Sequence, residues 1–188
     1  MKTRIAALAV IIAAGSLFAG EKVEINGEFK QLNPAKTAPA GWVKNFPKVQ
    51  DIGTGKIVPA REKDENAFQI TTSKRHTPYY TGKAYPVKPG DTIKMEADVK
   101  GSGKAELYVY LYDKGGYAAT GRLASGQADA DQFTKIKGSY TIKETYTVKR
   151  KGEKVEVVPS SARFVFGAVP KSDIVFENVE AEIESAKE

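Results

Sequence analysis

Cysteine is absent from this 188-residue chain, and histidine and tryptophan occur once each. Without cysteine the protein can form no disulfide, and thiol chemistry and cysteine-ligated metal sites are excluded. The single histidine, His76, is weak evidence for a metal site because no second histidine accompanies it. Burial of apolar side chains must therefore hold the chain together.

Long apolar runs are also missing, except at the N-terminus. Lys2 and Arg4 precede an unbroken apolar run, Ile5–Ala14, and small residues follow in Ser16–Gly20. This pattern predicts a secretory signal peptide over residues 1–20, too short for a spanning helix of roughly 20 apolar residues. Position 21 is Glu rather than cysteine, which excludes a lipid anchor. We therefore expect a secreted or periplasmic protein without membrane insertion.

Neither basic nor acidic residues are strongly in excess. Removal of residues 1–20 takes away two basic residues and no acid, so the net charge falls from +6 to +4. Apart from Lys149–Lys151, the basic residues are spread among acids, which argues against nucleic acid as a partner. An acidic polysaccharide or an anionic envelope surface fits this mild basic bias better. The remaining length predicts one domain over residues 21–184 and a tail over 185–188, in an oligomeric state that the sequence leaves undetermined.

Helical periodicity is also absent, because no segment repeats apolar residues every 3.6 positions. Short alternating runs separated by Gly, Pro, Asn and Asp occur instead. The predicted strands are Val23–Ile25, Ala67–Thr72, Asp91–Lys100, Ala105–Tyr112, Thr134–Ile142, Tyr146–Lys149, Lys154–Val158, Ala162–Ala168 and Ile174–Ile183. The pattern predicts an all-β fold, a two-sheet antiparallel β-sandwich of the jelly-roll kind.

Two of these strands have a clean division into an apolar and a polar side. Residues 93, 95, 97 and 99 are apolar in the first, and Leu107, Val109 and Leu111 in the second. The glycines at positions 101 and 103 predict a hairpin that joins the two strands, and a shared core then requires Val99 to lie opposite Leu107. This register pairs Asp98 with Tyr108, Glu96 with Tyr110 and Lys94 with Tyr112.

Three tyrosines on the side away from the core suggest a surface that binds a ligand. Tyrosine rings beside carboxylates and an ammonium group suit sugars, which stack on aromatic rings and offer hydroxyls to polar groups. The predicted ligand-binding residues of this surface are Tyr108, Tyr110, Tyr112, Lys94, Glu96, Asp98 and Arg75. The alternative is that the tyrosines pack under loops or beneath a neighbouring strand.

A second candidate site is the predicted loop Ser73–Tyr80. It contains His76, Tyr79 and Tyr80, and loops at the rim of a sandwich often carry binding residues. We expect the binding site to lie there if the tyrosines of the strand are covered.

Catalytic motifs are lacking. No nucleophile elbow, phosphate loop or zinc spacing occurs, and polar strand faces commonly place two carboxylates two residues apart, as with Glu96 and Asp98. The sequence predicts no enzyme, and Trp42 is expected to cap the core. In the last strand the apolar side switches at Glu177–Asn178, which predicts a β-bulge.

Five short segments occur in an order that resembles a known family. They are Ile25–Phe29 followed by Pro39–Trp42, Tyr85–Thr92, Phe133–Gly138 and Val175–Val179. Their order is similar to that in bacterial carbohydrate-binding modules of the galactose-binding-like jelly-roll type, which are attached to xylanases and cellulases. The resemblance implies a domain that binds a polysaccharide or oligosaccharide without cleaving it. It also implies a structural calcium ion near Glu28 and Glu177.

Two hypotheses of function remain. The first is a secreted, non-catalytic polysaccharide-binding module that uses the tyrosines. The alternative is a structural or adhesive envelope protein that uses the same sandwich to bind other proteins.

Overall fold

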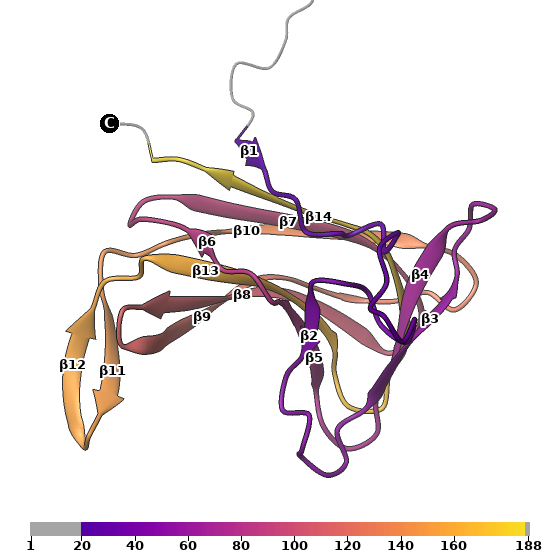
Figure 1. The fold of residues 1–188 in the computed structure, drawn as a ribbon, viewed down its shortest axis with the longest axis horizontal. Helices are drawn as coiled ribbons and strands as arrows, with labels where there is room; N and C mark the ends of the chain where they lie inside the picture. The colour runs from indigo at the N-terminus through magenta and orange to yellow at the C-terminus, as the bar shows by residue number, and fades with distance from the viewer. Residues whose placement is uncertain (1–19, 187–188) are drawn as a thin grey trace, which may run out of the picture.

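The computed structural model describes residues 20–186, which form two antiparallel β-sheets packed face to face (Figure 1). The predicted all-β sandwich is confirmed. Residues 1–19 and 187–188 lie outside the described residues, and with them nearly all of the predicted signal peptide. Within residues 20–186, no helix has the length and apolar character needed to cross a membrane.

Sheet I contains the strands that begin and end the described domain. In spatial order it consists of β10 (Thr134–Thr141), β7 (Thr92–Ser102), β14 (Asp173–Glu184), β4 (Asn66–Thr71) and β3 (Thr54–Pro59), with β1 (Glu21–Lys22) paired to β14. The predicted strand Val23–Ile25 is not formed, because regular pairing of this segment ends at Lys22.

Sheet II lies below sheet I in Figure 1. In spatial order it consists of β2 (Trp42–Lys44), β5 (Thr77–Thr81), β13 (Ser161–Ala168), β8 (Lys104–Asp113) and β9 (Gly116–Gln127), with β6 (Tyr85–Pro86) paired to β13. A separate hairpin is formed by β11 (Tyr146–Arg150) and β12 (Glu153–Val157).

Apolar side chains of both sheets meet between them. Five phenylalanines are fully buried there: Phe29, Phe68, Phe164, Phe166 and Phe176. Trp42 caps this cluster as predicted, since it is only 6% exposed and its ring centroid lies 4.6 Å from that of Phe166. Burial of large aromatic side chains supplies the main stabilisation of a domain that has no disulfide.

The predicted pairing of residues 91–100 with residues 105–112 is wrong. β7 pairs with β10 and β14 in sheet I, whereas β8 pairs with β13 and β9 in sheet II. The connection at Gly103, with φ +98°, takes the chain from one sheet to the other. The prediction failed because two half-apolar strands bury their apolar sides equally well as neighbours in one sheet or as partners across a sandwich.

The predicted β-bulge in the last strand is confirmed. The register of β14 against β7 shifts between Glu177 and Glu180, and Asn178 has a φ of 49°. The extra residue restores the inward direction of the apolar side chains, so that Phe176, Val179 and Ala181 are all buried.

Candidate functional site

The three tyrosines of β8 lie on the outer face of sheet II. Leu107, Val109 and Leu111 are fully buried against sheet I, so the alternate residues of the strand point to the opposite side. Tyr80 from β5 and Tyr117 from β9 join them there, since each has its ring centroid 6.1–6.2 Å from that of a β8 tyrosine. We call this surface the tyrosine face, formed by Tyr80, Tyr108, Tyr110, Tyr112, Tyr117 and Arg163.

Tyr110 lies at the centre of the tyrosine face. Its ring is 5.5 Å from that of Tyr108, 6.2 Å from Tyr80 and 6.1 Å from Tyr117, in three edge-to-face contacts. The Nδ2 atom of Asn45 donates a hydrogen bond of 2.9 Å to the hydroxyl oxygen of Tyr110. These contacts fix the orientation of a ring that is still partly exposed.

The tyrosine face is covered at one end and open at the other. Tyr108 is only 6% exposed, Tyr110 and Tyr112 are partly exposed, and Tyr117 is 54% exposed. Tyr108 thus has mainly a packing role, as the alternative interpretation of the sequence suggested for the tyrosines. Tyr110, Tyr112 and Tyr117 remain available to a ligand.

His76 helps to cover Tyr108. The two ring centroids are 5.5 Å apart, and Nδ1 of His76 lies 3.3 Å from the hydroxyl of Tyr108. One carboxylate oxygen of Glu106 lies 3.5 Å from Nε2 of His76, and the other forms an ion pair of 3.0 Å with Arg122. Burial lowers the pKa of His76, an effect that Glu106 opposes and Arg122 reinforces, and burial raises the pKa of Tyr108.

This pKa shift predicts a loss of stability in mild acid. A folded-state pKa below the ordinary 6.5 means that the fold favours neutral His76. The contribution of His76 to the free energy of unfolding should therefore be constant above pH 6.5. It should decrease as the pH falls from 6.5 toward the pKa of His76 in the folded state. Urea unfolding at a series of pH values would measure this decrease, and His76→Gln should lessen it. The prediction would be contradicted if the free energy of unfolding fell equally in mild acid for the wild-type protein and for His76→Gln.

Arg163 is a cation at the middle of sheet II that the sequence reasoning missed. It lies on β13 directly opposite Tyr110, with its guanidinium carbon 5.3 Å from the ring of Tyr80 and 5.6 Å from that of Tyr112. The side chain is partly exposed. Within residues 20–186 it forms neither an ion pair nor a hydrogen bond with another side chain. A single arginine in the strand pattern of residues 162–168 gave no signal, because only the register against β8 places it among the tyrosines.

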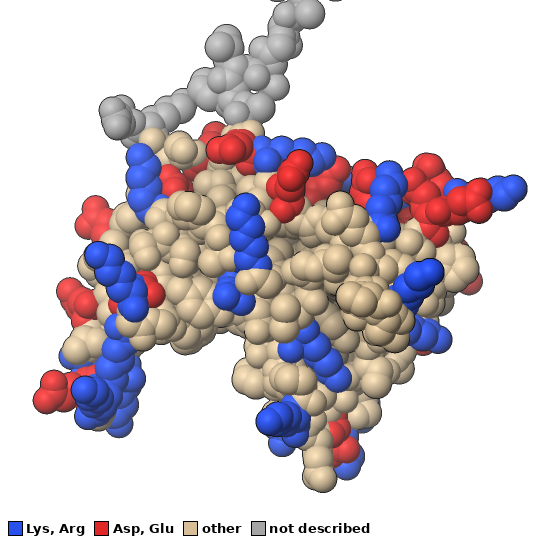
Figure 2. Space-filling model, viewed as in Figure 1, with Lys and Arg blue, Asp and Glu red and all other residues tan. Residues whose placement is uncertain are grey.

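Two projections flank the outer face of sheet II, at the bottom of Figure 1. One is the β11–β12 hairpin. Its Arg150 forms an ion pair with Asp113 at the end of β8, in which Nη1 of Arg150 lies 2.9 Å from Oδ2 of Asp113. The other contains the segment after β2, where Asn45 contacts Tyr110. Figure 2 shows the molecular surface hollowed between the two projections. Phe46, 57% exposed and adjacent to Asn45, is a further candidate that the sequence reasoning missed.

The predicted partners of the tyrosines lie on the other side of the sandwich. Lys94, Glu96 and Asp98 point outward from sheet I, because Ile93 and Met95 of the same strand fill the core. They form ion pairs with residues near them: Lys94 with Glu184 at 2.9 Å, Glu96 with Lys135, and Asp98 with Arg61. Sheets in a sandwich lie about 10 Å apart, and the tyrosines and these three charged side chains are on opposite outer faces. One sugar therefore cannot contact both groups of residues. The prediction of a joint site was wrong for the same reason as the register.

The second predicted cluster is divided by β5. Tyr79 and Tyr80 belong to this strand rather than to a loop, so they point to opposite sides. Tyr79 is 5% exposed and stacks on Phe166 at 6.1 Å, and burial raises its pKa to about 12. A ligand-binding role does not fit this core position, whereas Tyr80 is on the tyrosine face. Arg75 is exposed and lies just before β5.

The predicted calcium ligands have other partners. Glu177 is buried and accepts hydrogen bonds from the backbone nitrogen of Arg61 at 2.8 Å and from its Nε at 2.6 Å. Glu28 is exposed and pairs with Lys30 at 2.7 Å, which lowers the pKa of its carboxyl group. No group of three acidic or histidine side chains suited to a metal occurs among residues 20–186. In the structure a guanidinium and an ammonium stand beside the two carboxylates, and the calcium ion stays a prediction.

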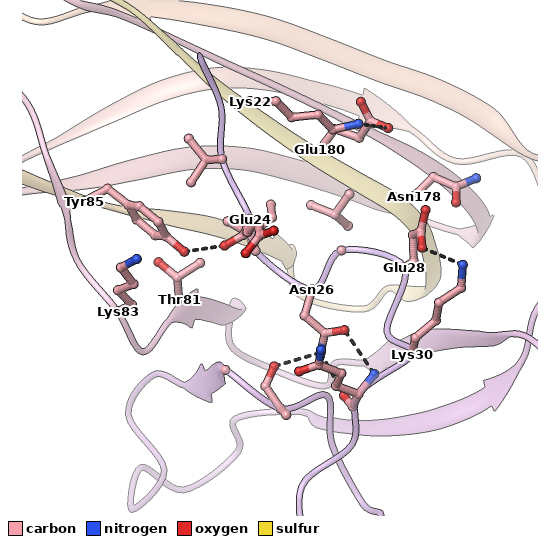
Figure 3. A pocket seen from close by; sticks show the side chains of 17 residues that line it. Lys22, Glu24, Asn26, Glu28, Lys30, Thr81, Lys83, Tyr85, Asn178 and Glu180 are labelled. Atoms are coloured by element: carbon pink, nitrogen blue, oxygen red, sulfur yellow. Dashed lines mark hydrogen bonds and ion pairs between the residues drawn. The ribbon is translucent and has the colours of Figure 1, made fainter.

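A second hollow, of about 680 Å³, lies beside the segment that contains the Ile25–Phe29 motif (Figure 3). Several of its polar groups contact one another. Lys22 pairs with Glu180 at 3.0 Å, Lys30 with Glu28 at 2.7 Å, and the hydroxyl of Tyr85 donates to the carbonyl oxygen of Glu24 at 2.6 Å. Tyr85 is the one aromatic side chain of this lining, whereas the tyrosine face presents several rings, so the tyrosine face is the stronger candidate for a sugar ligand.

Similar folds occur among carbohydrate-binding domains. The CBM22-1 xylan-binding domain of Paenibacillus barcinonensis Xyn10C has a TM-score of 0.58 and 12% identity, over 90% of this chain and 99% of that one. A putative sugar-binding protein of Bacteroides thetaiotaomicron has a TM-score of 0.54 and 12% identity, over 86% of this chain and 99% of that one. These similarities confirm the jelly-roll sandwich and the predicted resemblance to carbohydrate-binding modules at the level of the fold.

The same fold also occurs joined to a catalytic domain. The CBM22-1–GH10 modules of Clostridium thermocellum xylanase 10B, in complex with xylohexaose, have a TM-score of 0.55 and 14% identity. The match covers 89% of this chain and 29% of that one. No protein-family model and no curated protein sequence matches the chain.

Proposed function

We propose that this protein is a secreted, non-catalytic module that binds polysaccharide on the tyrosine face. The observation that carries the proposal is a set of mutually oriented tyrosine rings, centred on Tyr110, in a hollow between two projections. Rings held in edge-to-face contacts present flat apolar surfaces to the C–H face of a pyranose, while their hydroxyls reach its rim. The fold shared with xylan-binding domains supports this assignment.

The alternative, an envelope protein that binds other proteins, calls for a continuous exposed apolar patch. The exposed large apolar side chains of the described residues are few: Val43, Phe46, Tyr117 and Val158. The surface between the projections carries tyrosine hydroxyls and a guanidinium, polar groups that can orient a sugar ligand among the rings.

The proposal is tested by retention of the protein on insoluble polysaccharides, with xylan and cellulose as the first two. We expect retention on at least one polysaccharide, with no new reducing ends or unsaturated products after prolonged incubation. Glu96→Gln is the matched control, because Glu96 is on the outer face of sheet I and should not affect retention. Polysaccharide cleavage would contradict the non-catalytic assignment, and retention that depends on Glu96 but not on Tyr110 would move the site to sheet I.

A further inference from the structure

The acidic residues of the strands are distributed unequally between the two sheets. Strands of sheet I contain eight acidic residues: Glu21, Glu96, Asp98, Asp173, Glu177, Glu180, Glu182 and Glu184. Strands of sheet II contain only Glu106 and Asp113. In Figure 2 red side chains gather along the top of the molecule, over sheet I, and the hollow below is largely free of them.

Both carboxylates of sheet II are already paired with arginines. Glu106 binds Arg122 at 3.0 Å, and Asp113 binds Arg150. Arg163 is therefore the one arginine on these strands that has no carboxylate partner among residues 20–186. It is also the one at the centre of the sheet, opposite Tyr110.

Arg163 is partly exposed and has no carboxylate partner among residues 20–186, so its guanidinium is accessible to the anionic group of a ligand. The rings of Tyr80 and Tyr112, 5.3 and 5.6 Å from its central carbon, hold it in place through cation–π contact. Its N–H donors lie in its own plane and suit the two oxygens of a carboxylate. A single such cation between stacking rings fits a sugar that carries one carboxylate on its ring.

We propose that the polysaccharide bound by the tyrosine face is acidic, and that Arg163 binds the carboxylate of a uronate unit while the tyrosines stack against the sugar rings. This inference rests on the proposed function and specifies its class of ligand. The absence of a free acidic side chain on this sheet lets such a ligand approach without like-charge repulsion.

The experiment compares ligands in pairs that share one backbone and differ in whether they carry free carboxylates. Polygalacturonate with free carboxylates and its methyl-esterified form share one backbone, and glucuronoxylan and unsubstituted xylan form a second pair. We expect the wild-type protein to bind the charged member of at least one pair about tenfold more tightly, as a charge-assisted hydrogen bond can provide. Added salt should reduce this preference.

Variants at position 163 assign the preference to one side chain. Arg163→Gln should remove the preference for the charged ligand, whereas Arg163→Lys should retain part of it. Lys137→Gln, an exposed position on sheet I, removes the same charge from the other side and should leave the preference unchanged. Thermal unfolding would verify that all three variants are folded.

Each outcome supports or overturns a defined statement. Equal binding of charged and neutral ligands, or an unchanged preference in Arg163→Gln, would overturn the inference and leave the proposed function intact. Tighter binding of a sulfated polysaccharide than of any uronate would also overturn it. Failure to bind any polysaccharide would overturn the proposed function, and this inference with it.

Discussion

Replacement of Tyr110 with Ala is expected to weaken polysaccharide binding about 30-fold, the effect of about 2 kcal/mol that is typical of a central aromatic contact. Tyr110 contacts three other rings of the tyrosine face, so its loss removes a stacking surface and also frees Tyr80 and Tyr117 to move. No other single tyrosine of this face has as many ring neighbours.

Isothermal titration with soluble oligosaccharides, or retention on the insoluble polymer, would measure this loss. Tyr110→Phe is the matched control, because it keeps the ring and gives up only the hydrogen bond from Asn45. It should retain most of the affinity, while the melting temperature of both variants should stay close to that of the wild type. Unchanged affinity in a folded Tyr110→Ala protein would exclude the tyrosine face as the binding site.

Replacement of Phe166 with Ala is expected to have the largest effect on stability, about 3–5 kcal/mol of the free energy of unfolding. Phe166 is fully buried on β13 and lies within 6.1 Å, centroid to centroid, of five other rings: Phe29, Trp42, Phe68, Tyr79 and Phe176. These rings come from both sheets and from the segments that connect them, so the cavity would not collapse easily. Domains of this size are stable by only about 5–15 kcal/mol.

Urea unfolding followed by tryptophan fluorescence is well suited to this variant, because the single tryptophan lies against the substituted ring. Phe46→Ala provides the matched control, since Phe46 is 57% exposed and its removal should change the free energy of unfolding little. An unfolding midpoint for Phe166→Ala close to that of Phe46→Ala would show that the core does not depend on this ring.

Some residues of the candidate site followed from the sequence directly. Alternation in Leu107–Tyr112 separates a core side from an outer side, and the structure keeps that division. The bulge at Glu177 followed from a change in the same alternation. Strand β9 (Gly116–Gln127) was missed, because its small and polar residues carry little apolar signal, although it brings Tyr117 to the site.

Other features of the site depend on which strands are neighbours. Arg163 meets Tyr110 because β13 lies beside β8, although the two residues are far apart in the chain. Tyr79 and Tyr80 were predicted to act together, but pairing of β5 within sheet II sends one to the core and the other to the surface. Backbone hydrogen bonds hold neighbouring strands together. Because the backbone is chemically the same at nearly every position, the sequence does not indicate which strands will pair.

The sequence by itself determined the all-β class, the side of each long strand that is buried, and the tyrosine-rich character of one outer face. These properties are local, since they depend on residues one or two positions apart along a strand. Only the tertiary structure decided that β7 and β8 belong to different sheets, which separates the ion-paired outer face of sheet I from the tyrosine face. The physical reason is that an apolar strand side is buried equally well beside a partner or opposite one, so the choice depends on how the whole set of strands packs.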